Sequence, residues 1–260
     1  MQHAEYLQAE QLAQVNPLIH PQFRHAMYFP QIANVRNPRL LQSMIGYLKQ
    51  HHKVEFIEHC PIEQFNIVNG KVQSIRSQNK QIYFADQFVI TTGAWSKHWS
   101  EQLDLDIPVQ PVQGQMVLFK TPENWLPTMC MNKVMYLIPR LDGHVVCGSS
   151  MANCGFDTTP TAATKQTILE ACFEMVPELA AFPIVKQWAG LRPSSPTGVP
   201  YIGKMPELDN LWANFGHFRN GLCMGPASAR LLRQLILKQP TLLDPTAFCP
   251  TRLTANTLTT

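Results

Sequence analysis

Three short segments of the chain combine glycine with polar or aromatic residues in a way that suits binding of a cofactor or an anion. They are TTGAWS at residues 91–96, WAGLRP at 188–193 and GHFRNG at 216–221. Thr92 and Gly93 end an apolar run, where glycine either forms a plain turn or lets the backbone approach a cofactor closely. Each segment alone is ambiguous, so their side chains and their order have to be considered together.

Arg192 has the clearest chemical potential in the second segment. Its guanidinium offers a planar fork that matches a carboxylate with two hydrogen bonds. Tyr136, which alternates with Met135 and Leu137 along a strand-like run, offers a phenolic donor to the same anion. The alternatives are a surface arginine whose stem lies along apolar residues and a tyrosine ring that only packs. Together the two side chains are typical of a carboxylate-binding site.

The third segment precedes a run with helical spacing and should lie at the start of a helix. A helix N-terminus collects free N–H groups and partial positive charge, which suit an anion or the electron-rich C2 carbonyl of a reduced flavin. The alternative is a glycine-rich turn that only starts the helix. His217 is either part of this site or a structural histidine, and no partner marks it as a general base. We therefore expect no catalytic acid or base.

The elements that position these segments begin with a helix after Asn37 and Pro38, an N-cap followed by proline at the first helical position. Its apolar residues recur at helical spacing and should face inward: Leu40, Leu41, Met44, Ile45 and Leu48. Residues 54–57 predict a short buried strand, and Asn69 with Gly70 predicts a hairpin between residues 65–68 and 72–77. With the strand in residues 87–96, this order is typical of the later part of a doubly wound nucleotide-binding domain.

The middle of the chain has a different pattern. Residues 112–119, 134–139 and 144–150 resemble strands separated by tight turns, which indicates an antiparallel sheet. Thr159 and Pro160 should open a helix whose inward residues are Ile168, Leu169, Cys172 and Phe173.

The last third begins with residues 186–203, which are rich in proline, glycine and serine and should form a short strand followed by an irregular loop. Residues 211–216 predict a strand. A final helix should begin at or near Pro226, with an inner face of Leu231, Leu232, Leu235 and Ile236.

The composition excludes several classes of function. The 260 residues carry a net charge of +3 with scattered Lys and Arg, which argues against nucleic-acid binding. Seven cysteines without a C-x-x-C pair or zinc-like spacing argue against a disulfide framework and a metal site, and favour reduced thiols in the cytoplasm. Neither a signal peptide nor an apolar run near the roughly 18 residues of a membrane span is present. We expect a soluble, cytoplasmic protein.

Four motifs occur in order between residues 91 and 222. TGAWS (92–96) ends a strand, and YLIPRLDG (136–143) has the form Y-h-h-P-R-x-D/G-G. WAGLRP leads to PYIG (200–203), and GHFRNGL (216–222) starts the last helix. This succession resembles the D-amino-acid oxidase superfamily of FAD-dependent enzymes, most closely its glycine oxidases of the thiamine-biosynthesis type. A softer similarity extends to residues 27–41.

The resemblance implies an α/β and α+β fold, in which the C-terminal part of an FAD-binding Rossmann-like domain is interleaved with an antiparallel-sheet substrate domain. Residues 1–36 and 95–190 would belong to the substrate domain, and residues 37–94 and 191–260 to the FAD domain. Arg192 would pair with the substrate carboxylate, Tyr136 would hydrogen-bond it, and Arg219 would help to close the pocket on the flavin face. The remaining cofactor contacts would be Gly216, His217, Asn220, Gly221 and Leu222 at the flavin ring, and Pro61, Ile62, Thr92, Gly93 and Ala94 near the ADP half.

The activity that the resemblance implies is oxidative deamination of a small amino acid such as glycine, serving thiamine thiazole synthesis. A hydride would pass from the substrate α-carbon to flavin N5, the imino acid would hydrolyse, and dioxygen would be reduced to hydrogen peroxide. Such chemistry depends on orientation and electrostatics, which agrees with the absence of a convincing carboxylate pair. Members of the family often form oligomers, so the resemblance allows a homo-oligomer.

The sequence departs from the family at its start. Family members begin with a strand, a G-x-G-x-x-G turn and a helix that hold the FAD pyrophosphate, whereas residues 1–60 contain only one glycine, Gly46. We therefore expect a truncated chain that binds FAD weakly or not at all by itself. It would be a fragment, the product of a misplaced gene start, or one half of a split protein.

Two other functions remain open from the sequence. One is the oxidoreductase domain of a bifunctional tRNA wobble-uridine modifying enzyme, which shares the G-x-R and G-H-x-x-N-G features, although a basic patch for tRNA is missing. The other is a non-catalytic remnant that acts as a binding or assembly partner. A G-x-G-x-x-G sequence upstream in the reading frame would favour the truncated enzyme over the remnant.

Overall fold

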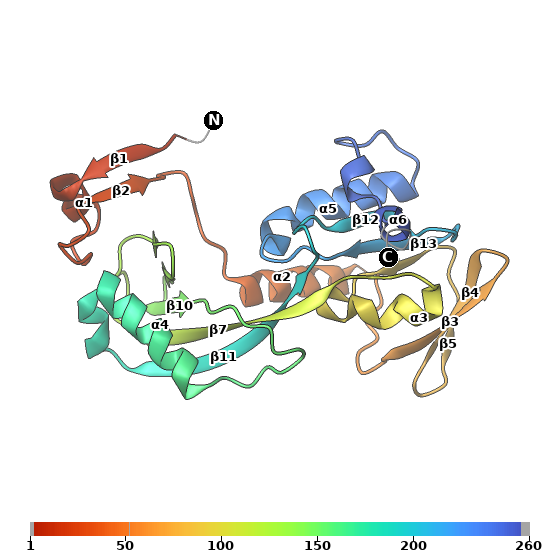
Figure 1. The fold of residues 1–260 in the computed structure, drawn as a ribbon, viewed down its shortest axis with the longest axis horizontal. Coiled ribbons are helices and arrows are strands. Elements are labelled where there is room, and N and C mark those ends of the chain that lie inside the picture. Colours follow the sequence, from red (N-terminus) through yellow and green to blue (C-terminus); the bar gives the residue numbers. More distant parts are fainter. Residues whose placement is uncertain (1–2, 52, 256–260) are drawn as a thin grey trace. The chain divides into compact units, whose positions relative to one another are not determined.

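The computed structural model describes residues 3–51 and 53–255, which form two units. Unit 1 comprises the residues up to Met44 and Gln113–Leu191, and unit 2 comprises Ile45–Val112 and the residues from Arg192 onward. The chain passes between the units within α2 (Asn37–Gln50), β7 (Gln110–Lys120) and β11 (Ile184–Ser194) (Figure 1). The assignment of segments to substrate and FAD domains stays a prediction.

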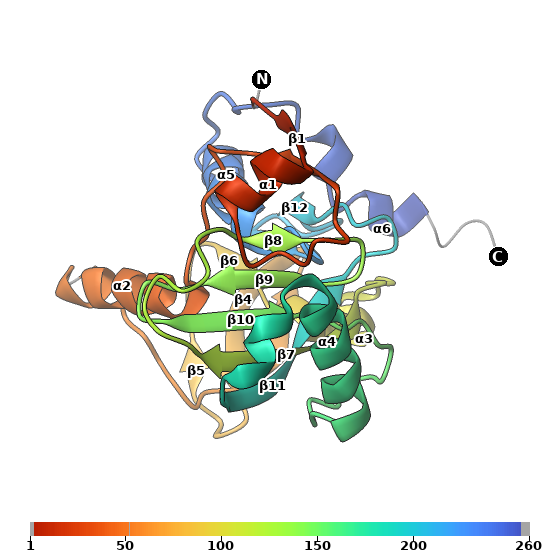
Figure 2. The ribbon, with the colours of Figure 1, turned by 90° about the vertical axis from the view of Figure 1, so that its left-hand side faces the viewer.

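Unit 1 is built on a five-stranded sheet in the order β11-β7-β10-β9-β8. Its other strands are β8 (Cys130–Met131), β9 (Tyr136–Pro139) and β10 (His144–Gly148). Strand β10 is antiparallel to both β7 and β9, so the antiparallel sheet expected from the middle of the sequence is confirmed. Figure 2 shows these strands in succession, with helix α4 beside them.

Helix α4 (Ala162–Met175) closes the core of unit 1. Its Ile168 and Cys172 are fully buried and pack in one cluster with Leu137 of β9 and Cys147 of β10. The helix begins after Thr161, whose hydroxyl accepts a hydrogen bond from the Thr164 N–H at 3.2 Å. The predicted inward face is therefore confirmed, and η2 (Pro177–Ala181) continues the same layer. A separate antiparallel ribbon is formed by β1 (Glu5–Gln8) and β2 (His25–Tyr28), joined through α1 (Ala9–Val15).

Unit 2 contains a three-stranded sheet in the order β12-β13-β6. Strand β13 (Leu211–Phe215) is antiparallel to β12 (Tyr201–Lys204) and parallel to β6 (Phe88–Ile90). Helix α5 (Gly221–Ile236) packs Leu231 and Leu232 against Ile202 of β12, which confirms the inner face expected of the last helix. Together with the antiparallel sheet of unit 1, this parallel pair confirms the mixed fold class expected from the sequence.

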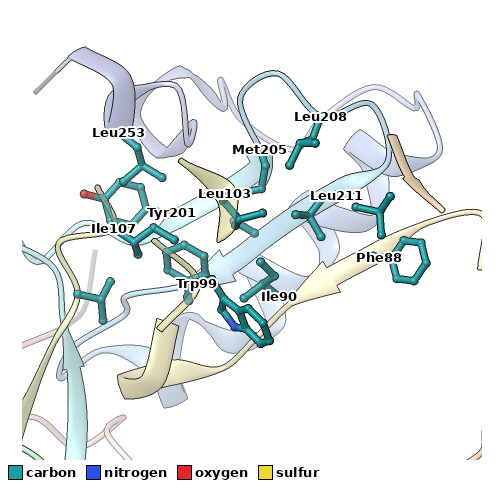
Figure 3. Close-up of a cluster of buried hydrophobic side chains, with 14 residues drawn as sticks. Phe88, Ile90, Trp99, Leu103, Ile107, Tyr201, Met205, Leu208, Leu211 and Leu253 are labelled. Carbon is teal, nitrogen blue, oxygen red and sulfur yellow. The ribbon is translucent and has the colours of Figure 1, made fainter. Parts of the chain in front are cut away.

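A second sheet of unit 2 contains β3 (Ile62–Val68), β4 (Lys71–Ser77) and β5 (Ile82–Tyr83). Asn69 and Gly70 join β3 to β4 with φ values of +51° and +72°, the backbone of a type I′ turn. The predicted hairpin is confirmed. Its partly buried residues pack against the main core of the unit, where Trp99, Ile107 and Tyr201 are buried (Figure 3). Trp99 ends η1 (Gly93–Trp99), which leads into α3 (Ser100–Leu103), and η3 (Thr246–Phe248) and α6 (Arg252–Ala255) complete the unit.

Two expectations about the region before the hairpin are wrong. Helix α2 forms as predicted, but its apolar face is exposed: Leu41 is 56% exposed and Met44 51%. Residues 54–57 form no strand, and their apolar side chains are exposed. The physical reason is the same for both, because their contacts leave the apolar side chains uncovered. Lys49 Nζ of α2 lies 5.9 Å from the centre of the Phe56 ring, and Glu55 and Ile57 lie beside Ile82 and Tyr83 of β5. An amphipathic pattern predicts a face, whereas burial needs a partner.

Two further expectations fail in the last third. Most of residues 186–203 was expected to be irregular, yet β11 extends through Trp188, Arg192 and Ser194 because it lies beside β7 in the sheet. Helix α5 begins at Gly221, so Pro226 lies inside it and not at its start. In β11, pairing with β7 outweighs the local proline signal. At the start of α5, the turn that precedes Gly221 does so.

Candidate functional site

The carboxyl ends of the parallel strands β6 and β13 bring two of the chemistry-bearing segments together. Ala213 of β13 lies opposite Ile90 of β6 in parallel register. Residues 91–96 follow β6 and residues 216–221 follow β13, so both segments leave the same edge of the sheet. Open α/β sheets bind ligands outside the carboxyl ends of their strands. This edge of unit 2 is therefore the candidate site.

Gly93 gives the first segment its shape. Its φ of +57° is in the left-handed region, which favours glycine, and a Cβ added there would meet nothing within 4 Å. Beside it, the Ser96 hydroxyl donates to the Gly93 carbonyl at 2.8 Å and lies 3.1 Å from the Thr92 hydroxyl. Ala94 is buried in the unit. The segment is thus internally braced, while Gly93 borders open space that another molecule can approach.

Gly216 and Gly221 are required by close packing in the second segment. Gly216 has a φ of +79°, and a Cβ there would lie 3.3 Å from Cδ2 of Tyr201. A Cβ on Gly221 would lie 3.2 Å from the Cβ of His217. The Phe218 backbone, with φ of +47°, turns the chain toward α5. The two glycines therefore allow a tight turn to deliver the helix start to the sheet edge.

His217 is held by the helix that follows it. Its Nε2 lies 3.0 Å from the Ser228 hydroxyl of α5, and Ser228 is buried. Burial lowers the pKa of His217 below its usual value, so the imidazole is neutral at neutral pH. The structure places this residue at the candidate site but ties its ring to α5. This geometry favours the structural alternative, in which His217 positions the turn.

The cap residue and first turn of α5 supply no side chain that neutralises the N-terminus of this helix. Asn220 occupies the N-cap without a side-chain hydrogen bond, and the first turn contains no acidic residue. Asn220 and Leu222 are exposed beside Gly221. Backbone N–H groups and the partial positive charge of this 16-residue helix thus face the site. Such an end can stabilise a negatively charged ring oxygen.

Arg192 lies next to the same turn. The Phe218 N–H donates to the Pro193 carbonyl at 2.8 Å, and Ser194 forms an antiparallel bridge with His217. Arg192 and Arg219 directly flank this hydrogen bond along the two segments. Arg192 is half-buried and Arg219 is exposed. The structure therefore brings two arginine positions near each other beside the start of α5, and their role toward a carboxylate stays a prediction.

Tyr136 belongs to unit 1 and is described within it. On β9 it lies opposite Gly148 of β10, and its hydroxyl is 3.9 Å from the Met116 sulfur, a weak acceptor. A Cβ on Gly148 would lie 3.1 Å from Cγ of Met116 and 3.5 Å from that hydroxyl, so the glycine leaves room for the Met116 side chain. The role of Tyr136 beside Arg192 stays a prediction.

Pro61 and Ile62, predicted near the ADP half of FAD, lie at the start of the hairpin sheet. The Pro61 carbonyl accepts a hydrogen bond from the Gln78 N–H at 2.9 Å, and Ile62 packs partly against the core of unit 2. These contacts account for where the backbone of Pro61 and Ile62 lies, but they do not indicate a ligand beside these residues. Their cofactor role also stays a prediction.

A polar cluster that the sequence did not single out lies in unit 1. Arg36 forms an ion pair with Asp142, and Asp142 also contacts His144 Nδ1 at 2.9 Å. The hydrogen bond from Arg36, with that from His144, holds the pKa of the Asp142 carboxyl well below its usual range. Arg140 donates to Asn34 Oδ1 at 2.6 Å. The cluster fastens residues 34–36 to the β9–β10 turn, and the R-x-D-G turn was its only sequence signal.

Asn214 is a second residue that the sequence did not mark. It lies on β13, shortly before Gly216, and its Oδ1 is buried without a hydrogen-bond partner among the described residues. An unsatisfied buried acceptor costs about 1–3 kcal/mol, and most buried acceptors in proteins have a hydrogen-bond partner.

Other kinds of site are not seen in the described parts of the chain. Residues 3–51 and 53–255 contain no group of three or more side chains that could hold a metal ion. Among the same residues, no helix is long and apolar enough to cross a membrane.

Comparison with known proteins gives a consistent picture. The family model for FAD dependent oxidoreductases, DAO, matches residues 1–235. The glycine oxidase of Pseudomonas putida is 42% identical over 90% of the chain, and that of Pseudomonas aeruginosa is 41% identical over 88%. The chain covers 64% and 62% of these two relatives, so it spans slightly under two thirds of their length.

The fold comparison agrees with the sequence comparison. The crystal structure of glycine oxidase from Geobacillus kaustophilus has a TM-score of 0.89 at 24% identity, over 96% of this chain and 67% of that one. L-proline dehydrogenase from P. horikoshii has a TM-score of 0.88 at 20% identity, over 97% of this chain and 69% of that one. The family match over most of the chain and this shared fold lead to one conclusion: the chain belongs to the DAO family of FAD-dependent oxidoreductases.

Proposed function

We propose that this chain is the substrate-binding and flavin-closing part of an FAD-dependent oxidase that deaminates a small amino acid such as glycine. The observation that carries the proposal is the edge of unit 2 where the uncapped start of α5, open space at Gly93 and the Arg192 backbone occur together. The names of the Pseudomonas relatives, which are glycine oxidases, support the choice of substrate class. A setting in thiamine synthesis is supported by relatives named bifunctional protein ThiO/ThiG.

The residues at this edge fit the flavin half of FAD. The N–H groups at the start of α5 suit the electron-rich side of the ring, and Gly216, His217, Asn220, Gly221 and Leu222 would line it. Thr92, Gly93 and Ala94 would approach the ADP half, together with Pro61 and Ile62. When bound, FAD would supply the hydride acceptor and pass the electrons to dioxygen.

The phosphate half of FAD lacks an evident holder in the described residues. The segment up to residue 60 has a single glycine, Gly46, and it lies inside α2. A pyrophosphate needs a turn through which the backbone can approach closely, followed by a helix start. We therefore expect the 260-residue chain alone to bind FAD weakly.

The protein's own contribution to the reaction would be to hold and orient the substrate. Arg192 would bind the carboxylate with two hydrogen bonds, Tyr136 would donate a third, and Arg219 would close the pocket. His217 would act as a positioning residue, because its Nε2 lies 3.0 Å from the Ser228 hydroxyl and this contact holds the ring against α5. Substrate orientation by fixed donors is sufficient for a hydride-transfer enzyme of this kind.

The function can be tested in a chimera. The part of the Pseudomonas putida glycine oxidase that this chain does not match would be joined to it, and FAD content and amine-dependent hydrogen peroxide would be measured. The expected result is a flavoprotein that releases peroxide with glycine or another small amino acid. A folded chimera that holds FAD stoichiometrically but gives no peroxide with small amino acids would refute the proposal.

A further inference from the structure

The C-terminal segment of the chain, residues 245–255, packs against strand β12 of unit 2. The family match ends at residue 235, so this segment lies beyond it. A Cβ added to Gly203 of β12 would lie 3.1 Å from Cδ of Pro250, which shows how closely the segment approaches the strand. Leu253 is buried in the same core as Tyr201, the first residue of β12 (Figure 3). The segment is therefore a fixed part of unit 2, and its polar side chains have fixed partners.

Arg252 of this segment holds the loop that connects β11 to β12. Its Nη2 donates to the Pro200 carbonyl at 2.9 Å and to the Val199 carbonyl at 3.5 Å. Its Nε donates to the Cys249 carbonyl at 3.4 Å, which ties the side chain to its own segment. The hydroxyl of Ser195, a buried residue, donates to the same Val199 carbonyl at 2.9 Å. Two side-chain donors thus converge on one carbonyl of the loop.

The guanidinium of Arg252 also lies over the ring of Tyr201. Its Cζ is 4.5 Å from the ring centre, within the range in which a cation is attracted to an aromatic face. Burial raises the pKa of Tyr201, so the ring is neutral and the attraction is to its face. A planar guanidinium can stack on a ring while its N–H groups donate to carbonyls, and an ammonium group cannot do both in this way. The two contacts therefore require arginine at this position.

The Tyr201 ring and the loop together form one wall of the turn at Gly216. A Cβ on Gly216 would lie 3.3 Å from Cδ2 of Tyr201 and 3.5 Å from Cβ of Ser195. The same turn carries Phe218, whose N–H donates to the Pro193 carbonyl of β11 at 2.8 Å. A shift of the ring or of the loop would therefore displace both the turn before α5 and the end of β11.

We propose that Arg252 is a positioning residue of the candidate site: by holding the Tyr201 ring and the loop after β11, it keeps the Gly216 turn and Arg192 in place. Resting on the proposed function, the inference gives the C-terminal segment a part in shaping the pocket for the flavin and the substrate carboxylate. Arg252 itself would touch neither, because its guanidinium is engaged by carbonyls and by a ring of the chain itself.

Three variants and one pair of small molecules test the proposal. Arg252→Ala removes both contacts, and Arg252→Lys keeps the charge but loses the planar fork. Arg233→Ala is the matched control, because Arg233 is exposed on α5 and donates to Gln239 Oε1 at 3.4 Å. Guanidinium at millimolar concentration replaces the group that Arg252→Ala lacks. Urea at the same concentration is its neutral control, with a similar shape and no charge.

Hydrogen exchange of the 260-residue chain gives a readout that needs no cofactor. The Gly198 N–H, which donates to the Ser195 carbonyl at 3.2 Å, reports on the loop, and the Phe218 N–H reports on the turn. Both should exchange about tenfold faster or more in Arg252→Ala, since hydrogen bonds from a charged donor are lost. Guanidinium should slow them again, and Arg252→Lys should lie between. The N–H of Val72, buried in the same unit, should exchange at an unchanged rate.

The chimera adds a readout at the site. Arg252→Ala should raise KM for glycine by about tenfold and change kcat less, because the substrate arginine is misplaced while the hydride acceptor is the same. Arg233→Ala should leave both constants unchanged. If Arg252→Ala also exposes the Val72 N–H, Arg252→Lys carries the comparison in both assays.

The outcomes separate this inference from the proposed function. Faster exchange at Gly198 and Phe218, in a chimera that forms no peroxide, supports the positioning role and refutes the oxidase. Peroxide formation with the same KM in Arg252→Ala and in the unchanged chimera overturns the positioning role alone. So do unchanged exchange in Arg252→Ala, an equal effect of Arg233→Ala, and equal rescue by urea. Loss of protection at Val72 in both Arg252 variants also overturns it, because Arg252 would then stabilise the whole unit.

Discussion

Replacing Gly216 and Gly93, two of the glycines of the candidate site, should separate effects on stability from effects on cofactor binding. In Gly216→Ala, the new Cβ lies 3.3 Å from Tyr201 Cδ2 and 3.5 Å from Cβ of Ser195, and both neighbours are buried. A left-handed φ costs a non-glycine residue about 1–2 kcal/mol. Overpacking of a closed site adds about 1–3 kcal/mol. We therefore expect Gly216→Ala to lower the free energy of unfolding by about 2–5 kcal/mol.

Gly93→Ala is the matched comparison. Its φ is also left-handed, but the Cβ meets nothing within 4 Å of the chain, so only the backbone cost of about 1–2 kcal/mol applies. The same methyl group projects into the space proposed for FAD. Gly93→Ala should thus lower the free energy of unfolding less than Gly216→Ala does, but should weaken FAD binding more. Gly46→Ala, on the exposed face of α2, should be neutral or slightly stabilising, because a helical glycine gains from the change.

The assays are urea unfolding of the chain and FAD titration of the chimera, followed by flavin fluorescence. A loss of 1 kcal/mol in the free energy of unfolding lowers Tm by roughly 2–4 °C for a chain near this size. Thermal melts should therefore rank the variants in the same order as urea unfolding. If Gly216→Ala and Gly93→Ala lowered the free energy of unfolding equally, the close packing around Gly216 would add nothing to the cost of the substitution. Unchanged FAD affinity in Gly93→Ala would show that the open space at Gly93 is not used by the cofactor.

Three more predictions concern charged and titratable groups. Arg192→Ala in the chimera should raise KM for glycine by about 10-fold to 150-fold, because a charged hydrogen bond contributes about 1.5–3 kcal/mol, and kcat should change less. An unchanged KM in steady-state assays would show that Arg192 does not bind the substrate. Because burial lowers the pKa of His217, the unfolded chain binds more protons, so stability should rise as the pH increases toward and past about 6.5. His217→Gln should flatten this slope in Tm measured against pH, and an identical slope would contradict the burial effect. The lowered pKa of Asp142 stabilises the folded chain at pH values above the ordinary aspartate pKa of about 3.9, and this stabilisation is lost as the pH falls below that value. The difference in free energy of urea unfolding between wild type and Asp142→Asn should therefore shrink in acid, and a difference that grows would contradict this.

Local chemistry made several elements predictable. Asn69 and Gly70 accept positive φ without strain, so their hairpin could be identified from two residues. The spacing of Leu231 and Leu232 predicted the buried face of α5, and that of Ile168 and Cys172 predicted the face of α4. These features depend on neighbours in sequence or on helical periodicity, which sequence patterns record.

Other features depend on partners that sequence patterns do not show. Residues 54–57 have the composition of a buried strand, yet they stay exposed because the described residues beside them, such as Ile82 and Tyr83 of β5, do not cover their apolar side chains. Arg192 was expected in a loop but lies in β11, since the place of that strand beside β7 outweighs the nearby proline and glycine. No pattern in the sequence indicates that Asn214 Oδ1 is buried without a hydrogen-bond partner among the described residues. None indicates that His217 Nε2 lies 3.0 Å from the Ser228 hydroxyl.

The sequence by itself predicted which residue types could bind a cofactor or an anion: glycines in two segments, an arginine with a planar fork, and a histidine before a helix. Only the tertiary structure decided that Thr92 and Gly93 lie at the same sheet edge as the turn at Gly216, because that depends on the parallel pairing of β6 with β13. Residue types set what a group can bind through local sterics and charge. Their convergence depends on backbone pairing between distant segments.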